Sequence, residues 1–218
     1  MKKLINTTTI TLYSALIAFS AYGLYLGHTN YEAFLNYIRE DGLIEYLTAI
    51  FLFAASIVSI YRVIEYRKLK RPLWVFTAAM LALLFFFGGG EEISWGQRIF
   101  NIESGEFFQK QNIQSETNLH NLAVGETNLN ILIFSQLIFI VLVAYFVLRV
   151  LTDKVLFVRN LVNKFNVPMP KYHHLIVMLG VNAIIAAMYV KKVSELHELA
   201  FAFVFFLIFL DPAKVKRD

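Results

Sequence analysis

The sequence predicts an all-helical, polytopic membrane protein with six transmembrane helices and both termini in the cytoplasm. Three observations lead to this fold class: a hydrophobic fraction of 58%, apolar runs long enough to cross a bilayer, and basic residues confined to alternate connecting segments. Charged residues make up 17% of the chain, below the roughly 25% usual in soluble domains. A soluble domain of this size could not bury so much apolar surface, whereas in a bilayer the same side chains face lipid.

Six apolar runs approach or reach the length of a transmembrane helix, which needs about 20 mostly apolar residues. They comprise residues 8–27, 43–61, 73–90, 128–148, 175–190 and 195–210. For the third run the sequence also allows a longer helix that continues through Phe100. The sixth run ends at Asp211-Pro212, since proline cannot continue a helix. The runs are too long for strands and do not alternate with period two, so we predict one helical domain over residues 1–218.

The first run has a second interpretation. Met1-Lys2-Lys3 followed by an apolar stretch resembles a secretory signal peptide, with Ala18-Phe19-Ser20 as a cleavage site. The orientation of the remaining chain is the same under either interpretation, because it depends on the later loops.

Lys and Arg gather in four segments that alternate with acidic or balanced ones. The basic segments are the N-terminus, residues 62–71, residues 149–171 and the C-terminus. Because cytoplasmic loops have the excess of Lys and Arg, both ends are placed inside and residues 101–127 become an outer loop. The net charge of +4 therefore reflects membrane topology and not a nucleic-acid partner. The absence of cysteine from the sequence excludes disulfides, thiolate metal sites and cysteine nucleophiles.

Polar side chains concentrate at the predicted outer ends of the helices. They are Glu45, Glu91, Glu92, Ser94, Trp95, Gln97, Arg98, Glu116, Asn118, His120, Asn121, Glu195, His197 and Glu198. Carboxylates beside histidine are the groups that acid–base or metal chemistry needs. We therefore predict a polar site at the outer membrane face, to which the outer loop contributes.

The segment from Glu91 to Arg98 is the most informative part of this site. If the helix continues, Glu91, Ser94, Trp95 and Arg98 share one face. Adjacent carboxylates near the membrane repel each other, so Glu91 and Glu92 should differ in proton affinity and serve as donor and acceptor. The alternative is that Arg98 neutralises one glutamate, the other faces water, Trp95 is a membrane-interface aromatic, and the preceding glycines pack closely against another helix.

The segment from Glu116 to Asn121 is the second candidate. On a helix, Glu116 and His120 would be stacked four residues apart, where they could hold a divalent metal such as zinc or iron, with Glu198 as a further ligand. The alternative is a surface loop whose Asn and Thr side chains form turns. Glu45 and Glu198 are expected to line the floor of the site. As residues of a first helical turn, both have the alternative role of complementing the helix dipole, with Asp41 as the cap before Glu45.

Two resemblances follow from these segments. GEEISWGQR (residues 90–98) and ETNLHN (residues 116–121) resemble a signature of uncharacterised small bacterial multi-pass membrane proteins, which implies a bacterial inner membrane and no particular activity. The chain is also partly similar to prenyl-protein (CAAX) protease-like membrane peptidases, with Glu-Glu-x-x-x-Arg, Phe-x-x-x-His and His-x-x-x-Asn motifs. Glu91-Glu92 matches the opening, but Arg98 comes two residues late, Glu116 replaces Phe, and neither His120 nor His197 precedes Asn at the required spacing. This similarity implies a glutamate-activated water.

The leading functional hypothesis is a membrane-embedded hydrolase or transferase that acts on a lipid or lipid-linked substrate at the outer face. Glu91 or Glu92 is the expected general base, Arg98 binds an anionic headgroup or stabilises developing negative charge, and His120 with Glu116 is a metal ligand or second acid–base group. The residues assigned to substrate binding are Trp95, Gln97, Asn118, Asn121 and Glu45. The loop should fold back over the third helix, so that these groups share one pocket. The alternative is a non-enzymatic protein, a small transporter or an assembly subunit that binds a partner or an ion there.

Overall fold

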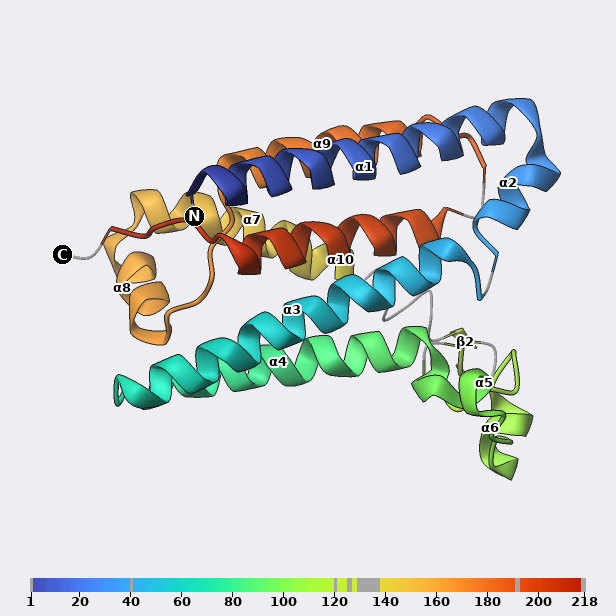
Figure 1. Cartoon of the computed structure of the whole chain (residues 1–218), viewed down its shortest axis with the longest axis horizontal. Coiled ribbons are helices and arrows are strands. Elements are labelled where there is room, and N and C mark those ends of the chain that lie inside the picture. The colour runs from blue at the N-terminus through green and yellow to red at the C-terminus, as the bar shows by residue number, and fades with distance from the viewer. Residues whose placement is uncertain are drawn as a thin grey trace.

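The computed structural model describes residues 2–39, 41–119, 121–124, 127–128, 138–190 and 193–216. It is helical almost throughout (Figure 1). The elements are α1 (Lys2–Thr29), α2 (Tyr31–Tyr37), α3 (Leu43–Lys68), α4 (Pro72–Glu92), the 3-10 turn η1 (Ser94–Gly96), α5 (Gln97–Phe100), α6 (Glu106–Gln111), the antiparallel pair β1 (Ala123–Val124) and β2 (Thr127–Asn128), α7 (Ile138–Lys154), α8 (Leu156–Phe165), α9 (Tyr172–Ala186) and α10 (Ser194–Leu210).

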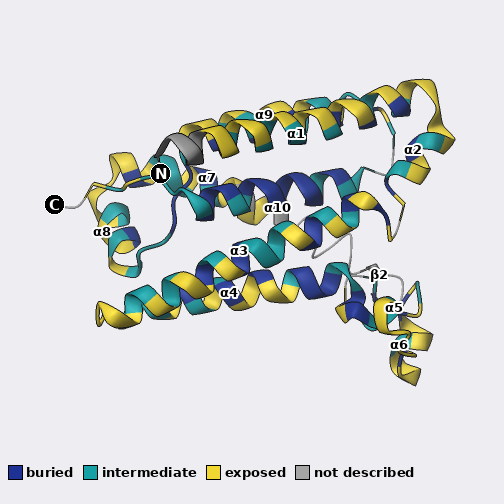
Figure 2. Ribbon diagram, viewed as in Figure 1, coloured by how far each residue is buried: buried dark blue, intermediate teal, exposed yellow. Residues whose placement is uncertain are grey.

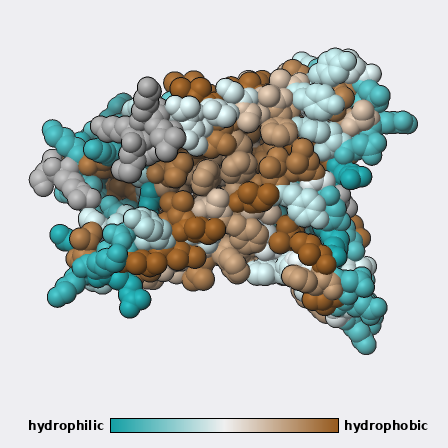
Figure 3. All heavy atoms as spheres, viewed as in Figure 1, coloured by the Kyte–Doolittle hydropathy of each residue, from teal (hydrophilic) through white to brown (hydrophobic). Residues whose placement is uncertain are grey.

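Three helices among the described residues are long and apolar enough to cross a membrane: α3, α4 and the part of α1 from Thr7 to Thr29. Apolar side chains form a band across the middle of the molecule, between hydrophilic ends (Figure 3). Large apolar side chains of the long helices, such as Ile57 of α3, Leu83 of α4 and Ile176 of α9, are exposed. A soluble protein rarely exposes so much apolar surface, so the prediction of a helical membrane protein is confirmed at this level.

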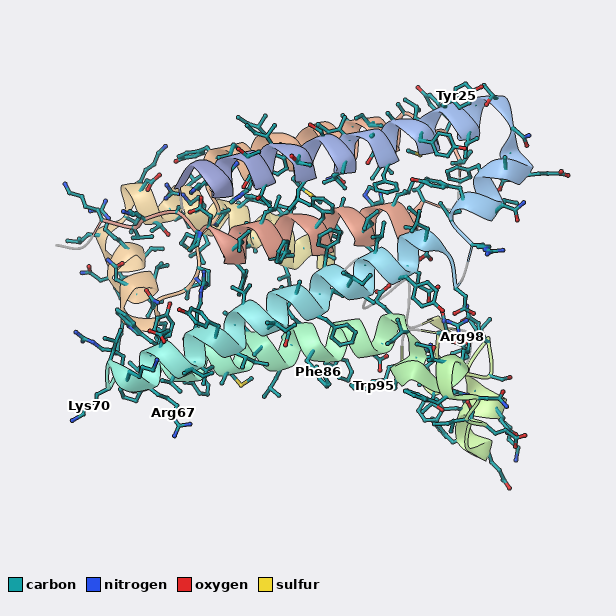
Figure 4. All side chains as sticks on the ribbon, in the orientation of Figure 1. Tyr25, Arg67, Lys70, Phe86, Trp95 and Arg98 are labelled. Atoms are coloured by element: carbon teal, nitrogen blue, oxygen red, sulfur yellow. The ribbon has the colours of Figure 1, made fainter. Side chains whose placement is uncertain are left out.

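The long helices run between the same two ends of the molecule (Figure 1). One end holds the start of α1, the turn between α3 and α4, α8 and the end of α10, and Arg67 and Lys70 lie there (Figure 4). We call it the basic end. The opposite end holds α2, the start of α3, the end of α4, and α5 and α6. We call it the acidic end, because the predicted site residues belong to it.

The centre of the bundle is α10, which corresponds to the predicted apolar run at residues 195–210. Most of its residues from Leu196 to Phe209 are buried, while α1, α3, α4 and α9 expose their outward faces (Figure 2). Phe203 packs against Phe51 of α3, with ring centroids 4.2 Å apart, and Phe209 packs against Phe85 of α4 at 4.8 Å. Aromatic packing of this kind fixes the middle of α10 against α3 and its end against α4.

Small residues bring α3 and α4 close together. The Ser56 hydroxyl in α3 donates a 2.8 Å hydrogen bond to the Ala82 carbonyl in α4. A Cβ on Gly89 would lie 3.0 Å from the ring of Phe53, so a larger residue at this position would push the helices apart. The interpretation of the glycines before Glu91 as a close-packing device is therefore confirmed at Gly89.

Several predicted boundaries need correction. α4 ends at Glu92, so the longer helix through Phe100 was wrong; Ser94, Trp95 and Gly96 have φ values of 47°, 56° and 76°, which end a right-handed helix. α9 ends at Ala186, short of the predicted end at residue 190. Asn128 belongs to β2 and not to a helix, and α7 is described from Ile138 onward, with residues 129–137 outside the described part of the chain. α10 starts within one residue of its predicted position.

Candidate functional site

The carboxylate of Glu91 joins the end of α4 to the loop that follows. Its Oε1 accepts a 2.8 Å hydrogen bond from the Trp95 indole Nε1–H, and its Oε2 accepts a 2.6 Å hydrogen bond from the Leu119 backbone N–H. The Trp95 ring packs edgewise on Phe86 and Phe87 and is 43% exposed, so it covers Glu91 on the side facing away from the bundle. Both oxygens of this buried carboxylate thus serve to hold the loop.

Ser94 and Glu116 form the second link between α4 and the loop. The Ser94 hydroxyl donates a 2.5 Å hydrogen bond to Glu116 Oε2. Asn118 Nδ2–H donates to the Ser94 Oγ at 2.7 Å and to the same Glu116 oxygen at 3.2 Å. All three side chains are buried, so each satisfies the polar groups of the others away from water.

Arg98 forms the third link, and it joins three segments. Its Nη1 lies 2.8 Å from Glu116 Oε1 and 2.6 Å from Asp41 Oδ2, and its Nη2 lies 3.4 Å from Glu45 Oε1. The Asp41 backbone N–H also donates to the Glu45 carboxylate. The N-cap of α3 is Gly42, so the interpretation of Asp41 as a cap was wrong; its side chain pairs with Arg98 instead.

Three amides assigned to substrate binding hold the loop in its own fold. Gln97 donates to Ser104 Oγ at 2.6 Å and accepts from the Thr117 N–H at 2.6 Å. Asn118 accepts from Asn112 Nδ2–H through both its side-chain and its backbone oxygen, at 2.8 and 2.9 Å. Asn121 donates to Gln114 Oε1 at 2.7 Å. These amides contribute to the order of the loop, while Trp95 and Glu45, also assigned to substrate binding, contact Glu91 and Arg98.

We call the links between α3, α4 and the loop the clasp. Its members are Asp41, Glu45, Glu91, Ser94, Trp95, Arg98, Glu116 and Asn118. The clasp folds the loop back over the end of α4, as the sequence predicted, but by a different route. The shared helical face from Glu91 to Arg98 was wrong, because the left-handed turn at Ser94–Gly96 interrupts the helix.

The stacked pair of Glu116 and His120 is also not present as predicted. Residues 116–119 are bends and irregular structure, so Glu116 does not belong to a helix on which His120 could stack. His120 itself lies outside the described residues. Its neighbour Leu119 donates to Glu91, which places the chain beside the end of α4 at this point.

Glu92 is directed to a different environment from that of Glu91. The charges that act on Glu92 most strongly are the carboxylates of Glu198, Glu195, Glu45 and Glu91, in that order. Glu195 and Glu198 come from the first turns of α10, and Glu45 from the first turn of α3. We call Glu92, Glu195 and Glu198 the inner acid cluster; it lies where α3, α4 and α10 meet.

Glu198 is the most isolated member of the inner acid cluster. Its side chain is 7% exposed, and neither carboxylate oxygen accepts a hydrogen bond from any residue that the structure describes. A buried carboxyl group without a donor costs several kcal/mol in its ionised form, a cost that a proton, a cation or a ligand donor would remove. The role of Glu198 as a simple partner of the helix dipole does not explain this burial.

The predicted metal ligands do not come together among the described residues. Glu116 belongs to the clasp and Glu198 to the inner acid cluster, and in the described part of the chain no three His, Asp or Glu side chains are placed to hold a metal ion. Among the described residues these side chains therefore form no zinc or iron centre, and no chemical step is assigned to one. The third predicted ligand, His120, lies outside these residues.

Sequence reasoning missed Asp41 as part of the site and treated Ser94 only as a polar neighbour. A cluster of Asp41 and Glu45 at one helix start, opposite a single Arg98, was the available signal, since a buried guanidinium needs carboxylate partners. Comparison of the chain with protein-family models, with curated proteins and with solved structures gives no match.

Proposed function

We propose that the protein is a membrane-embedded hydrolase or transferase that acts on a lipid or lipid-linked substrate at the outer membrane face, with Glu92 and Glu198 as its acid–base pair. The observation on which this rests is the different environment of the two adjacent glutamates. Glu91 is occupied by two donors from Trp95 and Leu119, whereas Glu92 faces other carboxylates across the bundle. Of the two glutamates, we therefore propose Glu92 as the general base.

Two carboxyl groups that share a poorly solvated space rarely both ionise. One of them therefore holds a proton and can act as an acid, while the ionised one can act as a base. In the proposed reaction the ionised group accepts a proton from the attacking water or hydroxyl. The protonated group donates its proton to the leaving oxygen, so that the net number of protons on the pair is unchanged. The apolar surroundings of α10 limit access of water to this pair.

The remaining site residues take other roles in this proposal. Arg98 is a positioning residue, because its guanidinium is engaged by Asp41, Glu45 and Glu116 and is not free to bind an anionic headgroup. His120 keeps its predicted role as a second acid–base group. Its test is His120→Gln, which should lower activity without the loss of fold expected of clasp variants.

The proposal also includes the finer topology: six spans, both ends in the cytoplasm, in a bacterial inner membrane. The common location of the α3–α4 turn, α8 and the end of α10 supports it, because these are the segments rich in Lys and Arg (Figure 1). A reporter active only in the cytoplasm should work when fused after Arg71 or Lys164 and fail after Gly105 or Gln114. A cytoplasmic Gln114 would contradict the outer location of the site.

Deletion of the gene and mass spectrometry of the extracted lipids and lipid-linked intermediates test the activity. Glu92→Gln and Glu198→Gln should reproduce the lipid profile of the deletion strain at normal protein levels, because the amide cannot exchange a proton in the same way. Glu106→Gln is the matched control, since Glu106 is exposed and pairs only with a neighbouring lysine among the described residues. A wild-type profile for both site variants would overturn the proposal.

A second candidate function is an assembly subunit that binds a partner through the loop. One observation favours it: the loop held by the clasp exposes the large apolar side chains of Phe100 (71%) and Ile113 (62%). The same strains separate the two candidates. If Phe100→Ser and Ile113→Ser abolish function while Glu92→Gln and Glu198→Gln do not, the docking function replaces the enzymatic one.

A further inference from the structure

The described part of the acidic end has an excess of negative charge, part of which is buried. The single positive charge of Arg98 faces three carboxylates, whose negative charges exceed it. Among the described residues, the charges that act most strongly on Glu92 and on Glu198 are those of other carboxylates. An anionic substrate group would be repelled by this arrangement, whereas a cationic one would be attracted.

Glu198 indicates which kind of cation fits. Both of its oxygens are buried, and neither accepts a hydrogen bond from a described residue. Among these residues no three carboxylate or imidazole side chains are placed to coordinate a metal ion. An ammonium group has three N–H donors around one compact charge, so it can contact oxygens on separate carboxylates without a fixed coordination geometry.

We infer that the inner acid cluster binds an ammonium group through Glu92 and Glu198, so that the substrate of the proposed enzyme is an amine-bearing lipid or lipid-linked molecule. The role of this ligand as a substrate rests on the proposed function, whereas the ammonium-binding site does not depend on it. The cluster lies near the start of α3, at the end of α4 and at the start of α10, whose following residues are apolar and buried. This location suits a molecule whose headgroup enters the bundle while its chains stay in lipid.

Trp95 provides a direct readout of binding. The chain has two tryptophans, and Trp74 lies on the basic side of α4, against Tyr66 and Arg71. Trp74→Phe therefore leaves Trp95 as the single indole, whose N–H is bonded to Glu91, the residue adjacent to Glu92. A ligand that reaches Glu92 should change the fluorescence of Trp95.

The experiment titrates the full-length Trp74→Phe protein in neutral detergent micelles with octylammonium, and separately with octyltrimethylammonium, ethylammonium and sodium ions. Octylammonium should give a saturable change in Trp95 fluorescence. Octyltrimethylammonium, with the same charge and chain but no N–H donor, should bind more weakly. Adding Glu198→Gln should weaken octylammonium binding about tenfold or more, as expected for loss of a hydrogen bond to a charged group. Glu92→Gln should act likewise, and Glu106→Gln should have no effect.

Unchanged octylammonium affinity in both folded variants, Glu198→Gln and Glu92→Gln, would overturn the inference, as would equal competition by sodium ions. Ethylammonium binding as tight as that of octylammonium would assign the site to a free amine and overturn the lipid part. If ammonium does not bind, the lipid-profile test of the two variants still tests the proposed enzymatic function on its own. If that test succeeds, the acid–base function stands with a different substrate; if ammonium binds but the lipid profile is normal, the site stands and the enzymatic proposal fails.

Discussion

Glu91 and Glu92 are neighbours in the chain, yet Glu91 belongs to the clasp and Glu92 to the inner acid cluster. These two regions differ in how far their polar groups are paired. In the clasp, buried polar groups meet partners from α3, α4 and the loop, and Glu91 accepts hydrogen bonds at both oxygens. In the inner acid cluster, Glu92 faces like charges, and Glu198 has no donor among the described residues. The satisfied region can stabilise the fold, while the unsatisfied one weakens it.

The difference suggests a division of roles between the two regions. Unsatisfied buried charge is costly and is expected where a ligand, proton or cation completes the site, whereas a network whose carboxylates all have donors specifies a single arrangement of segments. In the clasp, only Arg98 Nε among the described side-chain atoms is buried without a hydrogen-bond partner. Substitutions in the clasp should therefore lower stability and affect function only through the fold. Substitutions in the inner acid cluster should leave stability intact and abolish function.

The largest effect is expected for Arg98→Met. Removing the guanidinium leaves Asp41, Glu45 and Glu116 without their shared cation, and the free energy of unfolding should fall by about 3 kcal/mol or more. Titration of the purified protein with sodium dodecyl sulfate in mixed micelles measures this. Arg67→Met is the control, because Arg67 is exposed at the basic end. If the free energy of unfolding falls no more than in the control, Arg98 does not stabilise the clasp.

A smaller loss, about 2 kcal/mol, is expected for Asn118→Ala. The substitution removes donors to Ser94 and Glu116 and the side-chain acceptor of Asn112 Nδ2–H and of the Asn121 N–H, so several groups of the network lose one hydrogen bond each. The same unfolding titration applies, with the exposed Asn160→Ala as control. If both variants unfold at the same detergent fraction as the wild type, the loop is not held by this network.

Gly90→Ala should cost about 1 kcal/mol, the lower end of the usual range for overpacking, since the half-exposed Trp95 ring has room to shift. The added Cβ would lie 2.8 Å from that ring. Gly180→Ala is the matched control: it is also in a helix, and its Cβ would meet nothing within 4 Å, so it should stabilise the helix slightly. A blue or red shift of Trp95 fluorescence in Gly90→Ala, absent from Gly180→Ala, would show that the added Cβ acts on the Trp95 ring.

The smallest effect on stability is expected for Glu198→Gln, and its sign separates the two regions. Replacing a buried carboxyl group that lacks a donor should leave the free energy of unfolding unchanged or raise it. Glu116→Gln, which breaks an ion pair with Arg98, should lower it by about 1 kcal/mol or more. Equal losses in the two variants would show that Glu198 is a structural residue and end the comparison.

Much of the architecture could be predicted from the sequence. The membrane class, the start of α3 and both ends of α10 follow from local apolar runs and from Asp211-Pro212. The collection of polar residues at one end follows from the order of the helices, because each crossing returns the chain to the other end. The return of the loop over α4 followed from the cost of leaving Glu91 and Glu92 without partners.

What the sequence determined about this protein is thus the set of elements and the residues that meet at each end, since hydropathy and chain direction are local properties. Only the tertiary structure decided that α4 stops at Glu92, that α10 is the centre of the bundle, and that Arg98 pairs with Asp41. It also decided that Glu91 and Glu92 face different surroundings. The physical reason is that each of these depends on partners supplied by distant segments: the left-handed turn at Ser94 is compensated by Glu116, and the fate of each carboxylate depends on which donors the other helices bring within reach.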